Sequence, residues 1–249
     1  MARVDYTDTA EAYRRARTLP DEVLDVWRSS VEALRIRQPQ TVLDLGAGPG
    51  GFLGPLEDWF HAPVVAIEPS ASMRATATEV GLTVRFPYIA GRAEALPLGR
   101  ETIDVAWLST VIHQFDDRDR AAKELRRVTR PGGRVLVRGF FSDVPVTGLL
   151  SAFPGIARSA ESFPSTPEIV ECLEAAGFGV EPPENVVEPW QFELESWVNR
   201  VKSIRHTDSA LRPLTDSEFE EGLRVVRSSH SSSERIVSDG TLRLVVAIA

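Results

Sequence analysis

One acidic residue and a group of glycines stand where an apolar run gives way to a helical pattern. The run Thr41–Leu45 reads as a buried strand, and Asp44, Gly46, Gly48 and Gly50 occupy every second position across its end. Glycines in a strand-to-helix turn let a ligand approach the bare backbone, and the first N–H groups of the following helix lack partners. This turn is therefore the expected ligand site.

Two classes of ligand compete for the turn. Gly46, Gly48 and Gly51 satisfy the dinucleotide fingerprint G-x-G-x-x-G, and Glu68 ends the next predicted strand, where a ribose hydroxyl needs an acid. Asp44 favours the other class, because a buried carboxylate repels a pyrophosphate but attracts an amino-acid ammonium or a sulfonium. An NAD-binding oxidoreductase remains an alternative function.

The pattern from Asp44 to Gly50 resembles the first motif of the class I S-adenosylmethionine-dependent methyltransferases. The chain is similar to their small-molecule members, such as the ubiquinone and menaquinone C-methyltransferases and natural-product methyltransferases. The resemblance implies S-adenosylmethionine as the cofactor, with Glu68 on its ribose and Met73 against its adenine. The cofactor contacts that it implies are Asp44, Gly46, Ala47, Gly48, Gly50, Glu68, Pro69, Met73, Arg92, Ala93 and Ser109.

Two segments of the chain show which members of this family it resembles and where it departs from them. Arg92 stands where relatives usually carry an acid, so only backbone groups of Arg92 and Ala93 are expected to serve. The segment Ser109–His113 lacks the Asn/Asp-Pro-Pro-aromatic run of the amino-methylating nucleic-acid enzymes, and no acid there could hold a magnesium ion. We therefore expect metal-independent methyl transfer to an O, N or C nucleophile of a small organic acceptor. A protein that keeps the fold and binds the cofactor without transferring the methyl is the second alternative.

His113 is the candidate catalytic residue. Methyl transfer mainly needs an aligned attack and exclusion of water, and it needs a base only for a hydroxyl or a carbon acid. His113 follows the strand whose end is expected to face the methyl group, and an imidazole exchanges protons near neutral pH. The alternative is that His113 only contacts the cofactor or packs.

The candidate acceptor-binding residues are Tyr6, Tyr13 and Arg17, on the N-terminal helices. The alternative is that they are ordinary residues of amphipathic helices.

The composition is that of an ordinary globular protein. The 249 residues are 43% hydrophobic and 26% charged, and the formal net charge of -8 disfavours a partner rich in phosphate. The single Cys172 cannot form an internal disulfide, and no apolar run is long enough for a membrane helix. We expect a soluble cytoplasmic protein, a monomer or homodimer, with a small-molecule substrate and neither nucleic acid nor membrane as a partner.

Short strands alternate with helices from Thr41 to Phe141, which is typical of a doubly wound parallel sheet. Together with the resemblance, this predicts a Rossmann-like α/β fold whose sheet has seven strands, mostly parallel, with an antiparallel last strand. Strands are expected at Thr41–Leu45, Pro63–Glu68, Thr83–Ile89, Ile103–Leu108, Gly133–Phe140, Phe178–Glu188 and Leu242–Ala249. Helices are expected at about 51–60, 70–80, 118–129, 166–176, 193–205 and 215–228.

We expect a single domain over residues 1–249. Two helices within 1–40 form an N-terminal cap, and 41–141 is the cofactor-binding core. A substrate-side loop with a short helix follows at 142–165, and a helical insertion at 190–240 precedes the last strand and ends in a polar turn over 230–240. The N-terminal helices either lie over the substrate pocket, as the resemblance implies, or merely cover a sheet edge.

Overall fold

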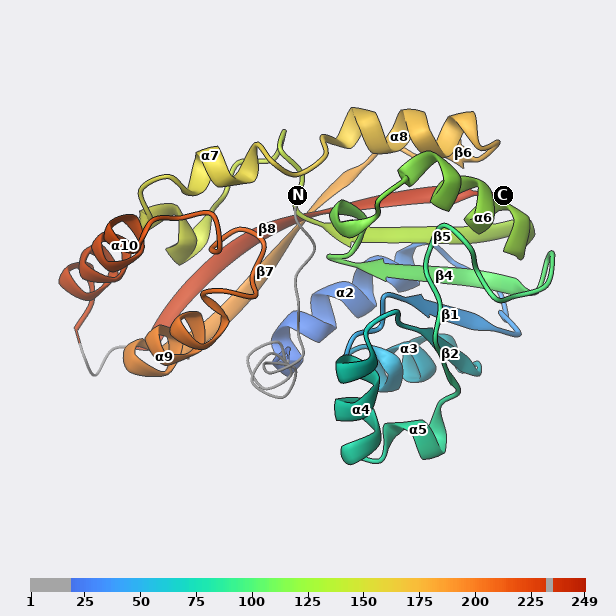
Figure 1. Cartoon of the computed structure of the whole chain (residues 1–249), viewed down its shortest axis with the longest axis horizontal. Coiled ribbons are helices and arrows are strands. Elements are labelled where there is room, and N and C mark those ends of the chain that lie inside the picture. Colours follow the sequence, from blue (N-terminus) through green and yellow to red (C-terminus); the bar gives the residue numbers. More distant parts are fainter. Residues whose placement is uncertain (1–18, 232–234) are drawn as a thin grey trace.

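Eight strands form one sheet in the computed structural model, which describes residues 19–231 and 235–249. Their order is β3-β2-β1-β4-β5-β8-β6, and β7 also pairs with β8. Strands β1 to β5 run parallel, and β8 runs antiparallel to β5, β6 and β7, so the predicted Rossmann-like fold with an antiparallel last strand is confirmed (Figure 1). The strands are β1 (Val42–Leu45), β2 (Val64–Ile67), β3 (Tyr88–Ile89), β4 (Ile103–Ser109), β5 (Thr129–Gly139), β6 (Gly179–Val180), β7 (Glu184–Glu193) and β8 (Arg235–Ile248).

Helices cover both faces of the sheet (Figure 1). Helices α2 (Asp21–Ala33) and α3 (Leu53–Phe60) pack on one face, and α6 (Arg118–Val128) and α8 (Thr166–Ala175) pack on the other. Because both faces are covered, the central strands are apolar along most of their length, as in other parallel sheets. The remaining helices are α4 (Ala71–Glu79), α5 (Leu82–Arg85), η1 (Ile112–Gln114), η2 (Gly148–Ala152), α7 (Ile156–Ala160), α9 (Leu194–Ile204) and α10 (Asp216–Ser229).

Side-chain caps determine where two of these helices begin. Ser165 and Thr215 accept hydrogen bonds from the backbone N–H of Glu168 and Glu218, and each glutamate reaches back to the N–H of its cap. Both helices therefore start with a capping box, which satisfies N–H groups that the first turn leaves without partners.

The single strand predicted at Phe178–Glu188 is wrong, because two strands occupy this segment and raise the count from seven to eight. Strand β6 ends at Val180 and β7 begins at Glu184. Pro182 and Pro183 stand between them, and a proline has no N–H to donate to a strand ladder. Both pieces still pair with β8.

The strand predicted at Thr83–Ile89 is also wrong over its first half. Gly81 adopts φ +76° and redirects the chain into the helical turn α5, so only Tyr88–Ile89 remain as strand. Val84, whose branched side chain suggested a strand interior, is 92% exposed. The β-branched residues in this segment have a high intrinsic strand propensity, but they are not buried as in a sheet, so the strand does not form.

The polar turn predicted for His230–Gly240 is wrong as well, because β8 already begins at Arg235. Ile236 and Ser238 are buried, whereas Val237 between them is exposed. This alternation is that of a strand with one covered face. Polar residues on both faces, such as Ser238 and Asp239, made the segment read as a turn.

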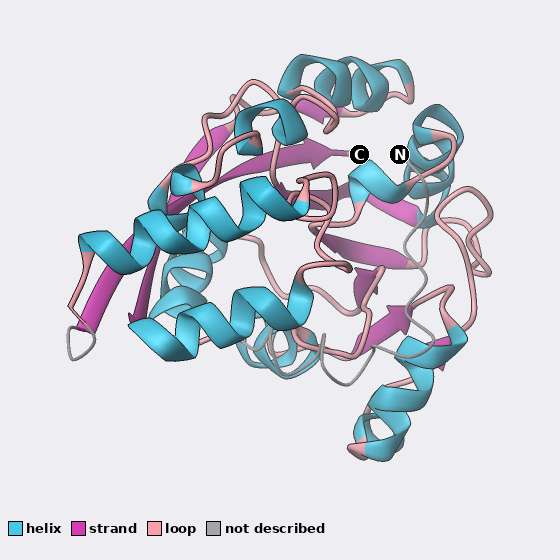
Figure 2. Cartoon of the chain, turned by 60° about the vertical axis from the view of Figure 1, so that its left-hand side comes forward, coloured by secondary structure: helices cyan, strands magenta, loops and turns pink. Residues whose placement is uncertain are grey.

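The outer halves of β7 and β8 form a two-stranded ribbon that extends past the parallel strands (Figure 1). The ribbon ends at the pair Glu193–Arg235, and the chain between these two residues carries α9 and α10. Seen from this end, the helices lie in front of the curled sheet (Figure 2). With η2 and α7 they enclose a third apolar cluster beside the two that flank the sheet. Within residues 19–231 and 235–249, no helix is both long and apolar enough to cross a membrane.

Candidate active site

The turn after β1 holds three glycines in backbone conformations that side chains disfavour. The φ angle is +75° at Gly46, +55° at Gly48 and +93° at Gly50. A Cβ at Gly46 would overlap the side chain of Val111, and one at Gly50 would lie 2.6 Å from Cδ1 of Leu82. Nothing lies within 4 Å of the corresponding position at Gly48. The turn therefore offers open space beside bare backbone at its middle glycine.

Two carboxylates flank this turn. Asp44, at the end of β1, is 2% exposed, and burial followed by the charge of Glu68 raises its pKa to about 8. Glu68 accepts the N–H of Gly48 at 2.9 Å and the N–H of Ser70 at 2.7 Å. Burial and the same two carboxylates raise the pKa of Tyr88, whose hydroxyl donates to the carbonyl of Gly48 at 3.3 Å. The two neighbouring carboxyl groups, Asp44 and Glu68, favour a cationic ligand at this turn.

A small cavity of about 100 Å³ lies beside the turn and the ends of β2 and β4. The side chain of Arg92, which lines it, forms an ion pair with Asp116. The cavity brings together eight residues that the sequence predicted as cofactor contacts: Gly46, Gly48, Glu68, Pro69, Met73, Arg92, Ala93 and Ser109.

A larger cavity of about 650 Å³ opens on the other side of the same turn. Asp44, Ala47 and Gly50, the three remaining predicted cofactor contacts, line it. Its other walls come from α2, β5, η2, β7, α9, the segment 208–211 and β8, and they are mainly apolar or aromatic. Leu19 and Leu24 bring the start of α2 to this cavity, while Trp27 of the same helix packs against the sheet. The two cavities meet at four shared residues, which are Gly46, Gly48, Ser109 and Thr110.

Comparison with known proteins identifies the family. Residues 43–137 match the family model described as a methyltransferase domain. The demethylmenaquinone methyltransferase of Streptomyces avermitilis is 32% identical over 198 residues, which make up 70% of this chain and 84% of that enzyme. The chain belongs to the class I S-adenosylmethionine-dependent methyltransferases.

Solved structures agree with this fold. The methyltransferase aligns with an S-adenosylmethionine-dependent methyltransferase from Aquifex aeolicus at a TM-score of 0.59 and 21% identity, over 72% of this chain and 93% of the other. It aligns with a candidate methyltransferase from an antibiotic biosynthesis pathway of Anabaena variabilis at a TM-score of 0.72 and 19% identity, over 93% and 98% of the two chains. At such identities the likeness shows the fold, and the family membership shows S-adenosylmethionine as the methyl donor.

Thr110 is a residue of this methyltransferase that the sequence did not mark. It stands where the two cavities meet, with φ +51°, and its N–H donates to the carbonyl of Arg138 at 2.7 Å. A β-branched residue at positive φ is rare and costs about 1–3 kcal/mol, a strain found mainly at functional sites. The sequence carries no signal for it, because threonine is ordinary at the end of a strand.

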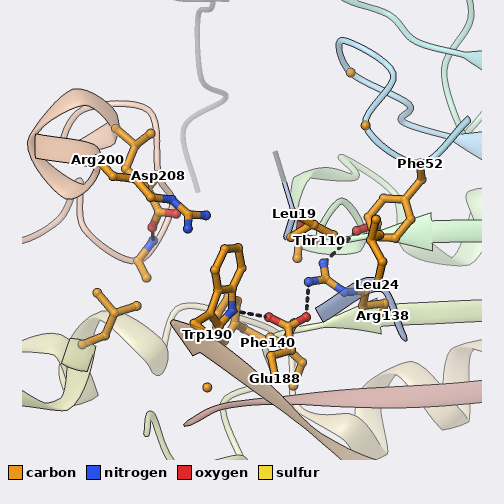
Figure 3. A pocket seen from close by; sticks show the side chains of 18 of the residues that line it. Leu19, Leu24, Phe52, Thr110, Arg138, Phe140, Glu188, Trp190, Arg200 and Asp208 are labelled. Carbon is orange, nitrogen blue, oxygen red and sulfur yellow. Dashed lines mark hydrogen bonds and ion pairs between the residues drawn. The ribbon is translucent and has the colours of Figure 1, made fainter. Parts of the chain in front are cut away.

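A buried ion pair at the floor of the large cavity was also missed. Arg138 of β5 pairs with Glu188 of β7, and both side chains are about 5% exposed. Glu188 further accepts the indole N–H of Trp27 at 2.6 Å and that of Trp190 at 2.9 Å, as Figure 3 shows for the part inside the cavity. The sequence offered little sign of this pair, because Arg138 and Glu188 are each one of three charged residues in their strand. Arg138 also donates to Oγ of Ser109 at 2.9 Å.

His113 lies in η1 and is not among the residues that line either cavity. Its Nε2 lies 2.9 Å from Oγ of Ser209, and its ring packs 4.7 Å from that of Phe163. Ser209 belongs to the segment whose neighbours Asp208 and Ala210 line the large cavity. The catalytic role of His113 stays a prediction.

The candidate acceptor-binding residues, Tyr6, Tyr13 and Arg17, lie outside the described residues.

Proposed function

We propose that this methyltransferase transfers the methyl group to a small, largely apolar organic acceptor that binds in the 650 Å³ cavity, without a metal ion. The meeting of the two cavities at Gly46, Gly48, Ser109 and Thr110 carries the proposal, because a donor bound along the turn would face an acceptor in the large cavity there. The name of the Streptomyces avermitilis relative, a demethylmenaquinone methyltransferase, supports an apolar acceptor. Cytoplasmic location, a monomeric or homodimeric state and the lack of a nucleic-acid partner belong to the same proposal.

The arrangement assigns a task to each part of the turn. Bound S-adenosylmethionine supplies a methyl group already activated on a sulfonium. Asp44 would hold the ammonium of its methionine part, the space beside Gly48 would admit it against the backbone, and Glu68 would bind the ribose hydroxyls. Ser109 and Thr110 border the point of transfer, while the apolar walls exclude water and align the acceptor.

We expect the affinity for S-adenosylhomocysteine to rise by about tenfold per pH unit up to about pH 8 and then to level off. Asp44, whose pKa burial raises to about 8, must release its proton to meet the ligand's ammonium, so acid competes with binding. Calorimetry over this pH range measures the profile, and Asp44→Asn should flatten it. A wild-type affinity that does not change with pH would assign the ammonium to another group.

Gly46→Ala and Gly48→Ala are expected to damage different properties. Each alanine costs about 1–2 kcal/mol in the left-handed conformation, and Gly46→Ala adds the overlap with Val111. Gly46→Ala should therefore show the lower melting temperature, whereas Gly48→Ala should mainly weaken cofactor binding, by about tenfold or 1.4 kcal/mol. Melting curves and calorimetry separate the two. Equal cofactor affinity in Gly48→Ala and the wild type would show that the ligand does not enter the space beside Gly48.

A screen with methyl-labelled S-adenosylmethionine tests the function itself. The acceptors are naphthoquinols, phenols, amines and carboxylic acids, each incubated with and without EDTA. The label should pass to an extractable product of one class, and its transfer should be the same with and without EDTA. Turnover lost in EDTA and restored by magnesium would contradict metal independence. If none of the four acceptor classes yields a methylated product, the proposed acceptor is wrong.

The two alternatives from the sequence are not favoured by the comparisons, and each has its own control. Formation of S-adenosylhomocysteine in step with methylated product separates a transferase from a protein that only binds the cofactor. A fluorescence titration with NADH addresses the oxidoreductase, which Asp44 disfavours because its carboxylate would lie near the pyrophosphate.

A further inference from the structure

The ionisable side chains of the large cavity are balanced in sign. Asp44 belongs to the cofactor turn, and the other four are Arg138, Glu188, Arg200 and Asp208, two cations and two carboxylates. Figure 3 shows them as two groups, with Arg200 beside Asp208 on one side and Arg138 beside Glu188 on the other. Apolar and aromatic groups fill most of the wall between them. These four side chains therefore carry no net charge.

Glu188 is the centre of the second group. Its Oε1 accepts from Trp27 of α2 and from Arg138 of β5, and its Oε2 accepts from Trp190 of β7. Three donors from three elements thus converge on one carboxylate that is 4% exposed. Such an arrangement neutralises the guanidinium and fixes the indole of Trp190 in the cavity wall.

Because of where Arg138 lies, neutralising its guanidinium affects which ligands the large cavity binds. Arg138 donates to Ser109, which lies where the two cavities meet, and its guanidinium lies 4.9 Å from the ring of Trp27 and 5.4 Å from that of Phe52. An unmatched guanidinium at this point would attract a ligand carboxylate into a dry site. With Glu188 present, such a carboxylate would be buried beside another carboxylate, which is strongly unfavourable.

We infer that Glu188 determines which acceptors bind, according to their charge. By neutralising Arg138 and holding Trp190, it makes the cavity select an uncharged molecule and reject an anion. The inference rests on the proposed function in one respect, that the large cavity takes the acceptor. Glu188 acts as a specificity-determining residue and takes no part in methyl transfer.

Two probes of matched shape test the inference, uncharged 2-naphthamide and anionic 2-naphthoate. Calorimetry with each probe is done in the presence of saturating S-adenosylhomocysteine. The wild type should bind 2-naphthamide at least about tenfold more tightly than 2-naphthoate, and Glu188→Gln should strengthen 2-naphthoate binding by about tenfold, because charge-assisted hydrogen bonds to the freed Arg138 become available. A protein that has merely lost structure would not gain affinity for an anion.

Further variants make the test reciprocal. Arg138→Met leaves Glu188 without its cation and should shift the preference to the cation 2-naphthylmethylammonium. Glu184→Gln, at an exposed position of the same strand, should leave all preferences unchanged. Equal binding of 2-naphthamide and 2-naphthoate by the wild type would overturn the inference. So would an unchanged preference in Glu188→Gln, or the failure of every probe to bind.

The acceptor screen distinguishes this inference from the proposed function. Methylation of an anionic acceptor would overturn the inference while leaving methyl transfer established. Failure of every acceptor, with the charge preference of the probes intact, would overturn the proposed function alone.

Discussion

Replacing Arg138 by methionine is expected to lower the free energy of unfolding by about 3–5 kcal/mol. The substitution leaves the carboxylate of Glu188 buried with two indole donors and no cation, and an uncompensated buried charge is costly. In a chain of this size, such a loss lowers the melting temperature by about 6–20 °C. Thermal unfolding followed by circular dichroism measures it.

Two comparisons isolate the buried charge as the cause. Arg224→Met removes the cation of an exposed ion pair with Glu221 and should leave the melting temperature nearly unchanged. The double variant Arg138→Met, Glu188→Leu removes both charges and should recover much of the stability that the single variant loses. An Arg138→Met protein as stable as the wild type would show that Glu188 finds another cation or water after the change.

His113→Ala is expected to slow methyl transfer by about 100-fold to 10,000-fold when the acceptor is a hydroxyl or an acidic carbon. The proton must leave as the methyl arrives, and only the neutral imidazole accepts it, so the wild-type rate should rise with pH as His113 loses its proton. Single-turnover rates over a range of pH, with cofactor affinity measured in parallel, provide the test. An amine acceptor is already neutral when it reacts, and there the substitution should cost little.

Ser209→Ala is the matched control for His113, because it removes the hydrogen-bond partner of Nε2 and keeps the imidazole. It should retain the pH profile and most of the rate. Equal losses in both variants would mean that His113 serves to hold the segment around Ser209 in place. Weaker cofactor binding with unchanged chemistry would make His113 a cofactor contact.

The sequence could bring the predicted cofactor contacts together because their information is local. Asp44 and the glycines share one turn, Glu68 and Met73 follow one strand, and each position is fixed by the strand end that carries it. Backbone geometry alone brings these strand ends to one edge of a parallel sheet. Local patterns at several strand ends, read with the family resemblance, were therefore enough to predict eleven residues that line two adjoining cavities.

The acceptor half could not be predicted in the same way, because its contacts join distant parts of the chain. Trp27 and Glu188 are 161 positions apart and come from a helix and a strand with no pattern in common. Their meeting depends on how α2 packs against β7, which periodicity does not encode. The outer half of β8 was misread for a related reason, since it carries turn-like residues such as Asp239 and Gly240.

The pairing of Glu193 with Arg235 has a practical consequence for engineering. The chain leaves β7 and re-enters β8 at a single point, so the segment between them, which carries α9 and α10, is a cassette inserted into a β-hairpin. A short hairpin turn, or the corresponding segment of a relative, could be spliced between these two positions without altering any strand pairing. Exchange of the cassette would replace the α9 wall of the acceptor cavity while retaining the cofactor turn, Arg138 and Glu188. Libraries of such chimeras would give new acceptor preferences on an unchanged methyl-donor site.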